Sequence, residues 1–250
     1  MATIAKTIVA TGATSGLGFE LVKQLLAQTQ PYKFILGARD TKTAQAAFDG
    51  LKYDGSKHSL TIFPLELSNL KTVKTFSQQT LDKLGQDKID YLLLNAAISK
   101  NAEQPGPFGS KWKYLEEDLK GGSKTERSVY ASTKFVQLLG AHWWHRQLKD
   151  KCQVVAVSPG LIPGTNLARN SGQAKEFVNH PDAKSVPEGA QSIYRAFTRD
   201  DIPEDPEQIF LTSWGEWWPK DVYGLTLDKA LQDKWSPSKE EIEKEEGLTS

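Results

Sequence analysis

A glycine-rich turn near the start of the chain follows an apolar run and leads into a helical pattern. The apolar run covers residues 7–10, the turn reads TGATSGLG from Thr11 to Gly18, and apolar side chains at helical spacing follow. Glycines in such a turn let backbone N–H groups approach a pyrophosphate at the positive end of the helix. An ordinary structural turn can use the same residues. The position within a βαβ unit favours a nucleotide site. Its first candidate residues are Gly12, Thr14, Ser15, Gly16, Leu17 and Gly18.

The rest of the chain continues the alternation of strand and helix patterns. Apolar runs at residues 34–36, 60–65 and 91–94 are typical of buried parallel strands, and helical patterns separate them. A long helix is predicted over residues 128–149, a strand over 153–157, a helix over 187–198 and a strand over 209–211. Alternation of this kind predicts an α/β fold. We expect a Rossmann-like, doubly wound parallel sheet with helices on both faces, in a single domain spanning residues 1–250.

Composition excludes several classes of partner. The chain has 31 basic and 31 acidic residues, so it lacks the positive excess typical of nucleic-acid-binding proteins. No apolar stretch is long enough to span a membrane. A β-type run at residues 6–10 leaves no room for a signal peptide, and Cys152 is the single cysteine. These features predict a cytoplasmic protein, with Cys152 as a small apolar residue that opens the strand at 153–157.

Three further motifs follow in a fixed order. Leu94-Asn95-Ala96-Ala97 ends the fourth predicted strand, Tyr130 and Lys134 have YxxxK spacing, and Ser158-Pro159-Gly160 forms a turn. Together with TGxxxGxG, they resemble the short-chain dehydrogenase/reductase family over nearly the whole chain. In the tail, residues 231–235 are followed by Ser238, Glu240, Gly247 and Leu248. That spacing is similar to the branch of the protochlorophyllide reductases and retinol dehydrogenases.

The resemblance implies a catalytic pair and a set of cofactor contacts. Tyr130 and Lys134 lie four residues apart and share a helix face. A nearby ammonium favours the phenolate, which lowers the pKa of a tyrosine from its usual value of about 10. Tyr130 would exchange a proton with the substrate, and Lys134 would also bind the nicotinamide ribose. The remaining cofactor-binding residues that the resemblance implies are Glu66, Leu67, Asn95, Ala96, Pro159, Gly160, Ile162 and Thr165.

The end of the second predicted strand indicates which cofactor is bound. An acidic residue here would hold the ribose 2′-hydroxyl of NAD, whereas an arginine would hold the 2′-phosphate of NADP. The chain has Ala38 at this position, followed by Arg39 and Asp40. A guanidinium makes paired, charge-assisted contacts with phosphate, so we expect NADP(H). The alternative is that Arg39 and Asp40 form an exposed ion pair of little energetic value.

One part of the family pattern is missing. In the family, the interval that here runs from Asn95 to Tyr130 holds a helix, a central strand ending in the catalytic serine, and a loop. Here it offers one helix candidate, residues 111–120, and no β-type run. The chain therefore resembles a member with an internal deletion, and we expect the sheet to lack one central strand. The strand at 153–157 should then pair with residues 91–94 or leave a breach beside them. Ser123 is the best remaining candidate for the serine.

These observations leave three functional hypotheses. The leading one is an NADPH-dependent oxidoreductase that transfers a hydride between the nicotinamide and a carbonyl or hydroxyl group of a bulky lipophilic molecule. The second is a catalytically impaired or non-redox relative that binds only nucleotide, and the third is an interaction module. The helix that carries Tyr130 is a candidate homodimer interface. His142 and His145 are expected to pack rather than bind zinc. Trp214, Trp217 and Trp218 belong either to the core or to the wall of a substrate pocket.

Overall fold

The computed structural model describes residues 4–97, 126–149, 151–168 and 178–248, with backbone alone for 126–130 and 168. The chain divides into two compact units. Unit 1 comprises Met1–Ile98 and Leu161–Phe197, and unit 2 comprises Ser99–Gly160 and Thr198–Ser250. Each is described by itself below. The single domain predicted over residues 1–250 remains a prediction.

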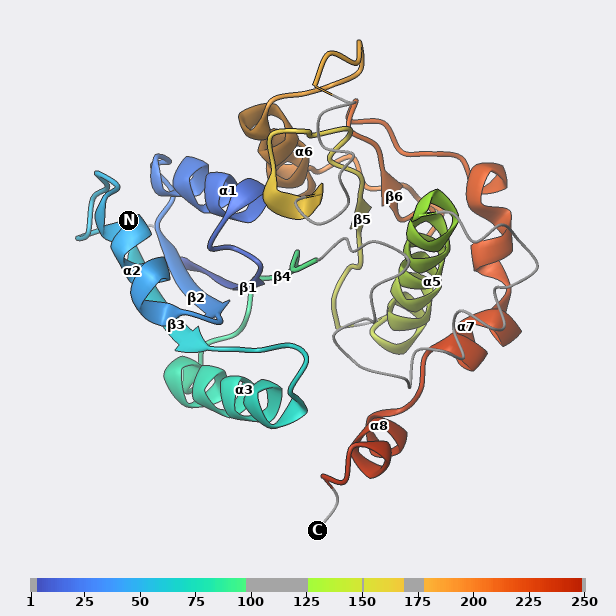
Figure 1. Cartoon of the computed structure of the whole chain (residues 1–250), viewed down its shortest axis with the longest axis horizontal. Helices are drawn as coiled ribbons and strands as arrows, with labels where there is room; N and C mark the ends of the chain where they lie inside the picture. The colour runs from blue at the N-terminus through green and yellow to red at the C-terminus, as the bar shows by residue number, and fades with distance from the viewer. Residues whose placement is uncertain (1–3, 98–125, 150, 169–177, 249–250) are drawn as a thin grey trace. The chain divides into compact units, whose positions relative to one another are not determined.

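Unit 1 contains a four-stranded parallel sheet with the order β3-β2-β1-β4. The strands are β1 (Lys6–Thr11), β2 (Tyr32–Ala38), β3 (Ser59–Pro64) and β4 (Tyr91–Leu94). The helices are α1 (Gly16–Leu26), α2 (Thr41–Asp49), α3 (Leu70–Leu84) and α6 (Val186–Thr198), with a short 3₁₀ helix η2 (Asn166–Ala168). Figure 1 shows α1 and α6 on one side of the sheet and α3 on the other. The predicted α/β fold with a parallel sheet is confirmed.

The central strands β1 and β2 are buried on both faces, to which successive strand residues point in turn. On one face, Val9, Ile35 and Leu65 form a buried cluster with Phe76 of α3. On the side of the sheet that α1 covers, the Phe19 ring of α1 lies 4.9 Å from the Phe48 ring of α2. Central strands buried on both faces read as continuous apolar runs, which explains why their positions could be predicted from the sequence.

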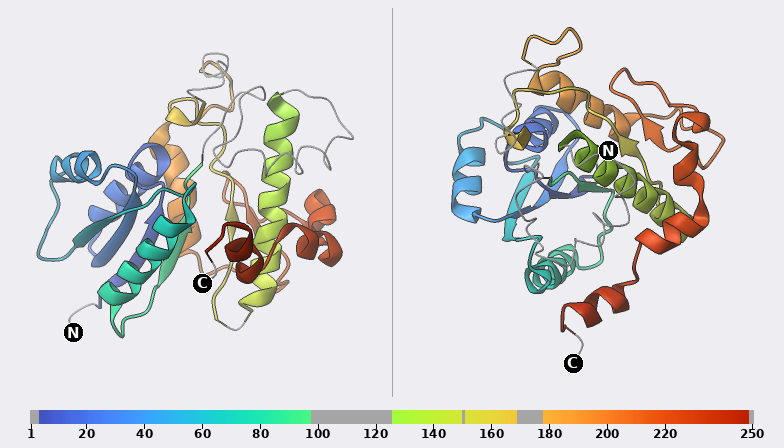
Figure 2. Two further views of the ribbon diagram at one scale, coloured as in Figure 1. Left: turned by 60° about the horizontal axis from the view of Figure 1, so that its bottom comes forward. Right: turned by 45° about the vertical axis from the view of Figure 1, so that its right-hand side comes forward.

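Unit 2 is built around a long helix. Its elements are α5 (Glu126–Gln147), β5 (Ala156–Val157), β6 (Phe210–Leu211), the 3₁₀ helix η4 (Lys220–Leu227), α7 (Lys229–Trp235) and α8 (Lys239–Glu245). Figure 2 shows α5 beside the C-terminal helices, and α5 contacts both η4 and α7. The buried His142 ring stacks on Tyr223 at 5.6 Å, and Arg146 pairs with Asp233. The charged, solvated helix expected in the tail is α8, and Ser238 caps it through a capping box.

Two expectations for the region around β5 need correction. The strand predicted over residues 153–157 is limited to Ala156–Val157, because its partner β6 is equally short and Pro159, just beyond, lacks an N–H donor. Cys152 is exposed and lies outside the strand, so the prediction that it is a packed residue opening the strand is wrong.

The strands on either side of the expected gap pair within their own units. Among the described residues, β4 pairs with β1 in unit 1, and β5 pairs with β6 in unit 2. Pairing of residues 153–157 with residues 91–94 remains a prediction. The predicted helix at 111–120, Ser123 and the rest of the interval at residues 98–125 lie outside the described residues. The absence of a central strand remains a prediction.

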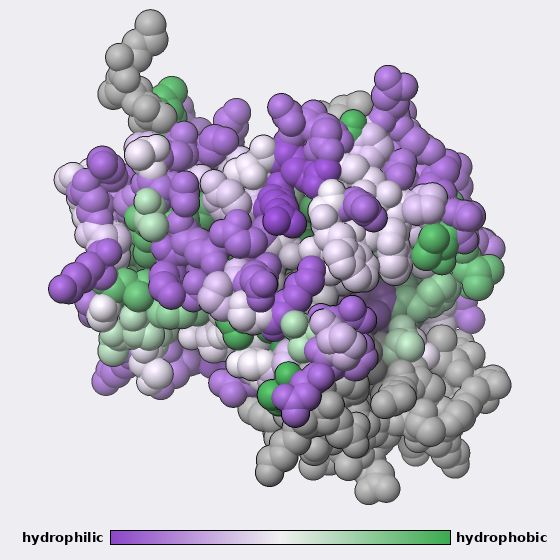
Figure 3. All heavy atoms as spheres, turned by 90° about the horizontal axis from the view of Figure 1, so that it is seen from above, coloured by the Kyte–Doolittle hydropathy of each residue, from purple (hydrophilic) through white to green (hydrophobic). Residues whose placement is uncertain are grey.

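One face of the structure is mainly polar. Figure 3 shows a face on which hydrophilic side chains predominate and apolar ones form small groups. No helix in the part of the chain that the structure describes is long and apolar enough to cross a membrane.

Candidate nucleotide-binding site

The glycine-rich turn forms a tight backbone cradle between β1 and α1. Gly12 has a φ of 64° and Gly16 a φ of 55°, a left-handed region that disfavours other residues. A Cβ atom added at Gly12 would lie 2.6 Å from the backbone nitrogen and Cα of Ala96. The turn therefore requires glycine at this position both for its conformation and for its contact with the end of β4.

The segment after β4 is attached to this turn by hydrogen bonds. The Asn95 Nδ2 donates to the Gly12 carbonyl oxygen at 2.9 Å, and the Ala96 N–H donates to the Thr11 hydroxyl at 3.3 Å. A Cβ atom at Gly18 would lie 2.3 Å from that same Gly12 oxygen and 2.8 Å from Asn95 Nδ2. Gly12, Gly18, Asn95 and Ala96, all predicted site residues, thus come together at the carboxyl ends of β1 and β4.

The amino end of α1 lacks a side-chain cap. Ser15 occupies the cap position without a side-chain hydrogen bond, and the first turn has no acidic residue. By contrast, Asp40 caps α2 and Asn69 caps α3. The first N–H groups of a helix need partners and carry partial positive charge. The uncapped end of α1, with Thr14 half-buried and Ser15 exposed beside it, therefore fits an anionic group such as a pyrophosphate.

The segment after residue 160 returns to the glycine-rich turn within the same unit. A Cβ atom at Gly16 would lie 3.7 Å from the Thr165 side chain, and the Thr165 hydroxyl donates to the Ile162 carbonyl at 3.3 Å. The side chains of Ile162 and Leu17 pack against Gly189 of α6. Leu17, Ile162 and Thr165 therefore lie beside the cradle, and their binding of a cofactor remains a prediction. Gly189 was not predicted, and no local signal marks it, because its closeness depends on long-range packing.

Arg39 follows β2 directly and is exposed. It makes no hydrogen bond or ion pair with any of the described residues. Asp40 instead caps α2, accepting from the backbone N–H groups of Lys42 and Thr43 and from the Thr43 hydroxyl. The Thr43 hydroxyl bond is the main cause that lowers the pKa of Asp40. The alternative of an Arg39–Asp40 ion pair is thus not observed, and the guanidinium can contact a ligand.

Glu66 and Leu67 follow β3, next to the end of β2. Leu67 is 37% exposed and has an apolar side chain that a ring can pack against. The Glu66 carboxylate accepts hydrogen bonds from Ser68, a residue that was not predicted to contribute.

The remaining predicted residues belong to unit 2. Tyr130 lies in the first turns of α5, and its side chain is outside the described part. Lys134 lies one turn further along, and its Nζ donates to the Gln137 Oε1 at 2.9 Å. Desolvation of its ammonium lowers the pKa of Lys134. Pro159 and Gly160 follow β5, and Gly160 has a φ of 89°.

Other features of unit 2 were also weighed as sites. No group of three His, Cys, Asp or Glu side chains that could hold a metal ion occurs among the described residues. Trp217 donates its ring N–H to the Asp201 carbonyl at 3.0 Å, and Trp218 stacks on Phe210 at 5.1 Å. Trp214 is 63% exposed. Trp217 and Trp218 are therefore held by contacts within unit 2.

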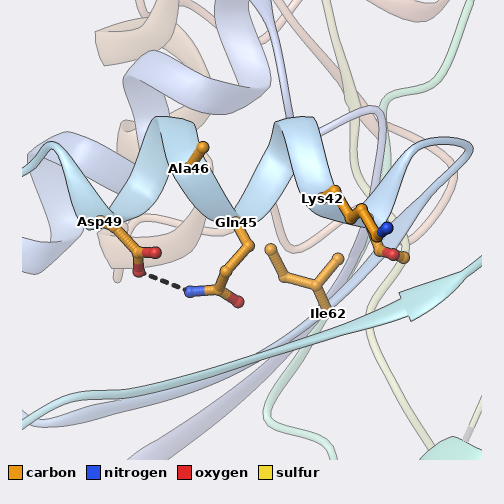
Figure 4. Close-up of a pocket in the computed structure, with 6 residues that line it drawn as sticks. Lys42, Gln45, Ala46, Asp49 and Ile62 are labelled. Atoms are coloured by element: carbon orange, nitrogen blue, oxygen red, sulfur yellow. Dashed lines mark hydrogen bonds between the residues drawn. The ribbon is translucent and has the colours of Figure 1, made fainter.

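A shallow groove of about 460 Å³ lies along α2 and is floored by Ile62 of β3. Figure 4 shows Lys42 and Asp49 at opposite ends of the helix, with Gln45 bonded to Asp49 between them. None of the predicted site residues lines this groove. The glycine-rich cradle therefore remains the candidate site.

Comparison with known proteins gives the same family as the motifs. A family model described as short chain dehydrogenase matches residues 6–112. A short-chain dehydrogenase/reductase of Pestalotiopsis microspora is 52% identical over 288 positions, covering 97% of this chain and 99% of that protein. This alignment has more positions than the 250 residues of the chain, so the relative has residues where this chain has none. Human retinol dehydrogenase 13 is 27% identical over 95 residues, covering 38% of this chain and 28% of that protein.

Among solved structures, an NADPH-bound carbonyl reductase from chicken fatty liver is similar, with a TM-score of 0.62. It is 17% identical, and the match covers 87% of this chain and 95% of that chain. At this identity the likeness supports the fold. The long match at 52% identity supports more: the chain belongs to the short-chain dehydrogenase/reductase family of oxidoreductases.

Proposed function

We propose that this protein is an NADPH-dependent oxidoreductase that transfers a hydride between the nicotinamide and a carbonyl or hydroxyl group of a bulky lipophilic small molecule. The observation that carries the proposal is the cradle at Gly12, closed by Asn95 and open at the uncapped end of α1. Such a cradle suits the pyrophosphate of a dinucleotide. Its other members would be the residues predicted from the sequence, with Ile162 and Thr165 beside Gly16.

The preference for NADPH rests on Arg39. Arg39 directly follows β2, the position at which dinucleotide-binding folds bind a 2′-phosphate. Its guanidinium forms no hydrogen bond or ion pair with the residues that the structure describes. A planar guanidinium can give two parallel hydrogen bonds to phosphate. The chicken carbonyl reductase with a similar fold is NADPH-bound, which agrees with this choice.

Tyr130 and Lys134 would carry the proton transfer. When bound, the dinucleotide supplies the hydride to the carbonyl carbon, and Tyr130 donates a proton to the carbonyl oxygen to give the alcohol. Lys134, one helical turn away on α5, favours the phenolate that remains and would hold the ribose. Pro159 and Gly160 would line the nicotinamide end.

The alternative is a family member that binds nucleotide but reduces little or nothing. The short interval between Asn95 and Tyr130 favours it, as does the alignment that is longer than this chain. Loss of the strand that ends in the catalytic serine would remove the group that polarises the carbonyl.

The tail residues that resemble the retinol dehydrogenase branch favour a lipophilic substrate. A homodimer through α5 also belongs to this proposal.

Fluorescence titration of the full chain with NADPH and NADH, followed by a panel of carbonyl compounds, tests the proposal. We expect NADPH to bind more tightly, and oxidation of NADPH to depend on the added carbonyl compound. Tight binding without turnover across aromatic, steroidal and aliphatic carbonyls would favour the alternative. Absence of binding to either nucleotide would refute both.

A further inference from the structure

The carboxylate of Glu66 lies at the same edge of the sheet as Arg39. β2 and β3 are adjacent and parallel, with Ala38 paired to Pro64 at their carboxyl ends. The Leu65 N–H donates to the Ala38 carbonyl at 2.8 Å, which extends this pairing by one residue. Arg39 and Glu66 are therefore the first charged residues beyond two neighbouring strand ends.

The position of Glu66 is fixed by hydrogen bonds of its backbone and of its carboxylate. Its N–H donates to the Thr72 hydroxyl at 3.0 Å, and that hydroxyl donates to the Glu66 carbonyl at 2.7 Å. Its Oε1 accepts from the Ser68 N–H at 3.0 Å and from the Ser68 hydroxyl at 2.9 Å. The carboxylate is thus held in the turn between β3 and α3.

Glu66 and Arg39 influence each other without forming an ion pair. The Ser68 N–H is the largest cause that lowers the pKa of Glu66, and the positive charge of Arg39 contributes in the same direction. Among the described residues, no carboxylate lies within ion-pair distance of Arg39. Glu66 is therefore a fixed negative charge near a guanidinium whose hydrogen-bonding face remains open.

We propose that Glu66 is a specificity-determining residue that weakens the binding of a 2′-phosphate at Arg39 and so limits the preference for NADPH over NADH. The inference rests on the proposed function, since it assumes that Arg39 receives this phosphate. A phosphate monoester carries a charge of about −1.5 to −2 and is repelled by the carboxylate. A 2′-hydroxyl carries no charge and is not repelled, so Glu66 acts on one cofactor and not on the other.

The variant Glu66→Gln tests this directly, because glutamine keeps an oxygen that can accept from Ser68 and loses the charge. Adenosine 2′,5′-bisphosphate and AMP serve as probes in isothermal titration calorimetry, since they differ only in the 2′-phosphate. We expect Glu66→Gln to tighten binding of the bisphosphate by about three- to tenfold, as for two charges several ångströms apart near water. Binding of AMP should stay unchanged, and the gain should shrink as salt screens the charges.

Asp49→Asn is the matched control, since it removes one carboxylate at the far end of α2 (Figure 4). It should change binding of neither probe. Equal effects of Glu66→Gln on both probes, or no effect on the bisphosphate, would overturn the inference. Wild-type protein that binds the bisphosphate no better than AMP, with no response to Arg39→Ala, would instead refute the proposed phosphate site and the inference with it. Far-UV circular dichroism confirms that each variant is folded.

Discussion

Substituting Gly12 by alanine tests whether the backbone cradle is the nucleotide site. The alanine would keep a φ of 64°, and its Cβ would lie 2.6 Å from the backbone of Ala96. A left-handed conformation costs a non-glycine residue about 1–2 kcal/mol. Backbone atoms cannot rotate away as a side chain can, so the crowding adds about 1–3 kcal/mol. We expect Gly12→Ala to lower the free energy of unfolding by about 2–5 kcal/mol in all.

Two other glycines separate these contributions. Gly85 has a φ of 60° with no atom within 4 Å of an added Cβ, so Gly85→Ala incurs the backbone strain alone. Gly55 has neither a positive φ nor a neighbour within 4 Å. Gly55→Ala should therefore be neutral or stabilising by up to about 1 kcal/mol. All three positions lie in unit 1, so the comparison is made within one unit.

The assay combines urea unfolding with nucleotide titration. All seven tryptophans lie in unit 2, at positions 112, 143, 144, 214, 217, 218 and 235. Tryptophan fluorescence therefore reports on unit 2, so circular dichroism, which reports on both units, is needed to detect unfolding of unit 1. The fluorescence of NADPH itself is the probe for binding. We expect Gly12→Ala to abolish NADPH binding and Gly85→Ala to preserve it. If Gly12→Ala were no more destabilising than Gly85→Ala and bound NADPH normally, the close contact with Ala96 would not be part of a nucleotide site.

Three further predictions concern charge and catalysis. Arg39→Ala should remove the preference for NADPH over NADH in fluorescence titrations, and unchanged selectivity would contradict the role of Arg39. Tyr130→Phe should abolish any turnover, measured as NADPH oxidation, while binding stays intact; retained activity would place the chemistry elsewhere. Burial lowers the pKa of His142 from 6.5 to about 4. Unit 2 should thus have its full stability above pH 6.5 and lose up to about 3 kcal/mol as the pH falls toward 4. Tryptophan-detected urea unfolding measures this loss, and His142→Phe should remove most of it.

Local patterns in the sequence were sufficient to predict the cradle and the central strands. The turn from Gly12 to Gly18 follows from the need for close backbone approach at a helix end, and apolar runs mark strands buried on both faces. The contacts that complete the cradle join distant residues, as Asn95 does with Gly12 and Thr165 with Gly16. No periodicity encodes such pairs. Their prediction depended on the resemblance to a family.

Prediction from the sequence was less accurate where a structure depends on a partner residue or strand. Residues 153–157 have the composition of a strand, but a strand extends only as far as its partner allows, and β6 has two residues. The prediction of Glu66 as a cofactor-binding residue overlooked Ser68, whose N–H and hydroxyl donate to the carboxylate two residues earlier. This short-range pattern, an acidic residue followed by serine at the second position, was visible in the sequence and is a known turn-forming arrangement for shorter acidic side chains.

The distribution of the proposed residues between the two units has a consequence for function. The hydrogen bond from Asn95 to Gly12 and the contact of Thr165 with Gly16 both lie within unit 1. Among the described residues, the contacts that build the proposed cradle and position Arg39 lie within unit 1. We therefore expect a deletion between Ala97 and Tyr130 to affect the proposed proton-transfer residues of unit 2 more than the proposed cradle. Nucleotide affinity and turnover should then respond to different substitutions. Tight NADPH binding together with slow reduction would be the expected behaviour of a chain that has kept the first half of its site and lost part of the second.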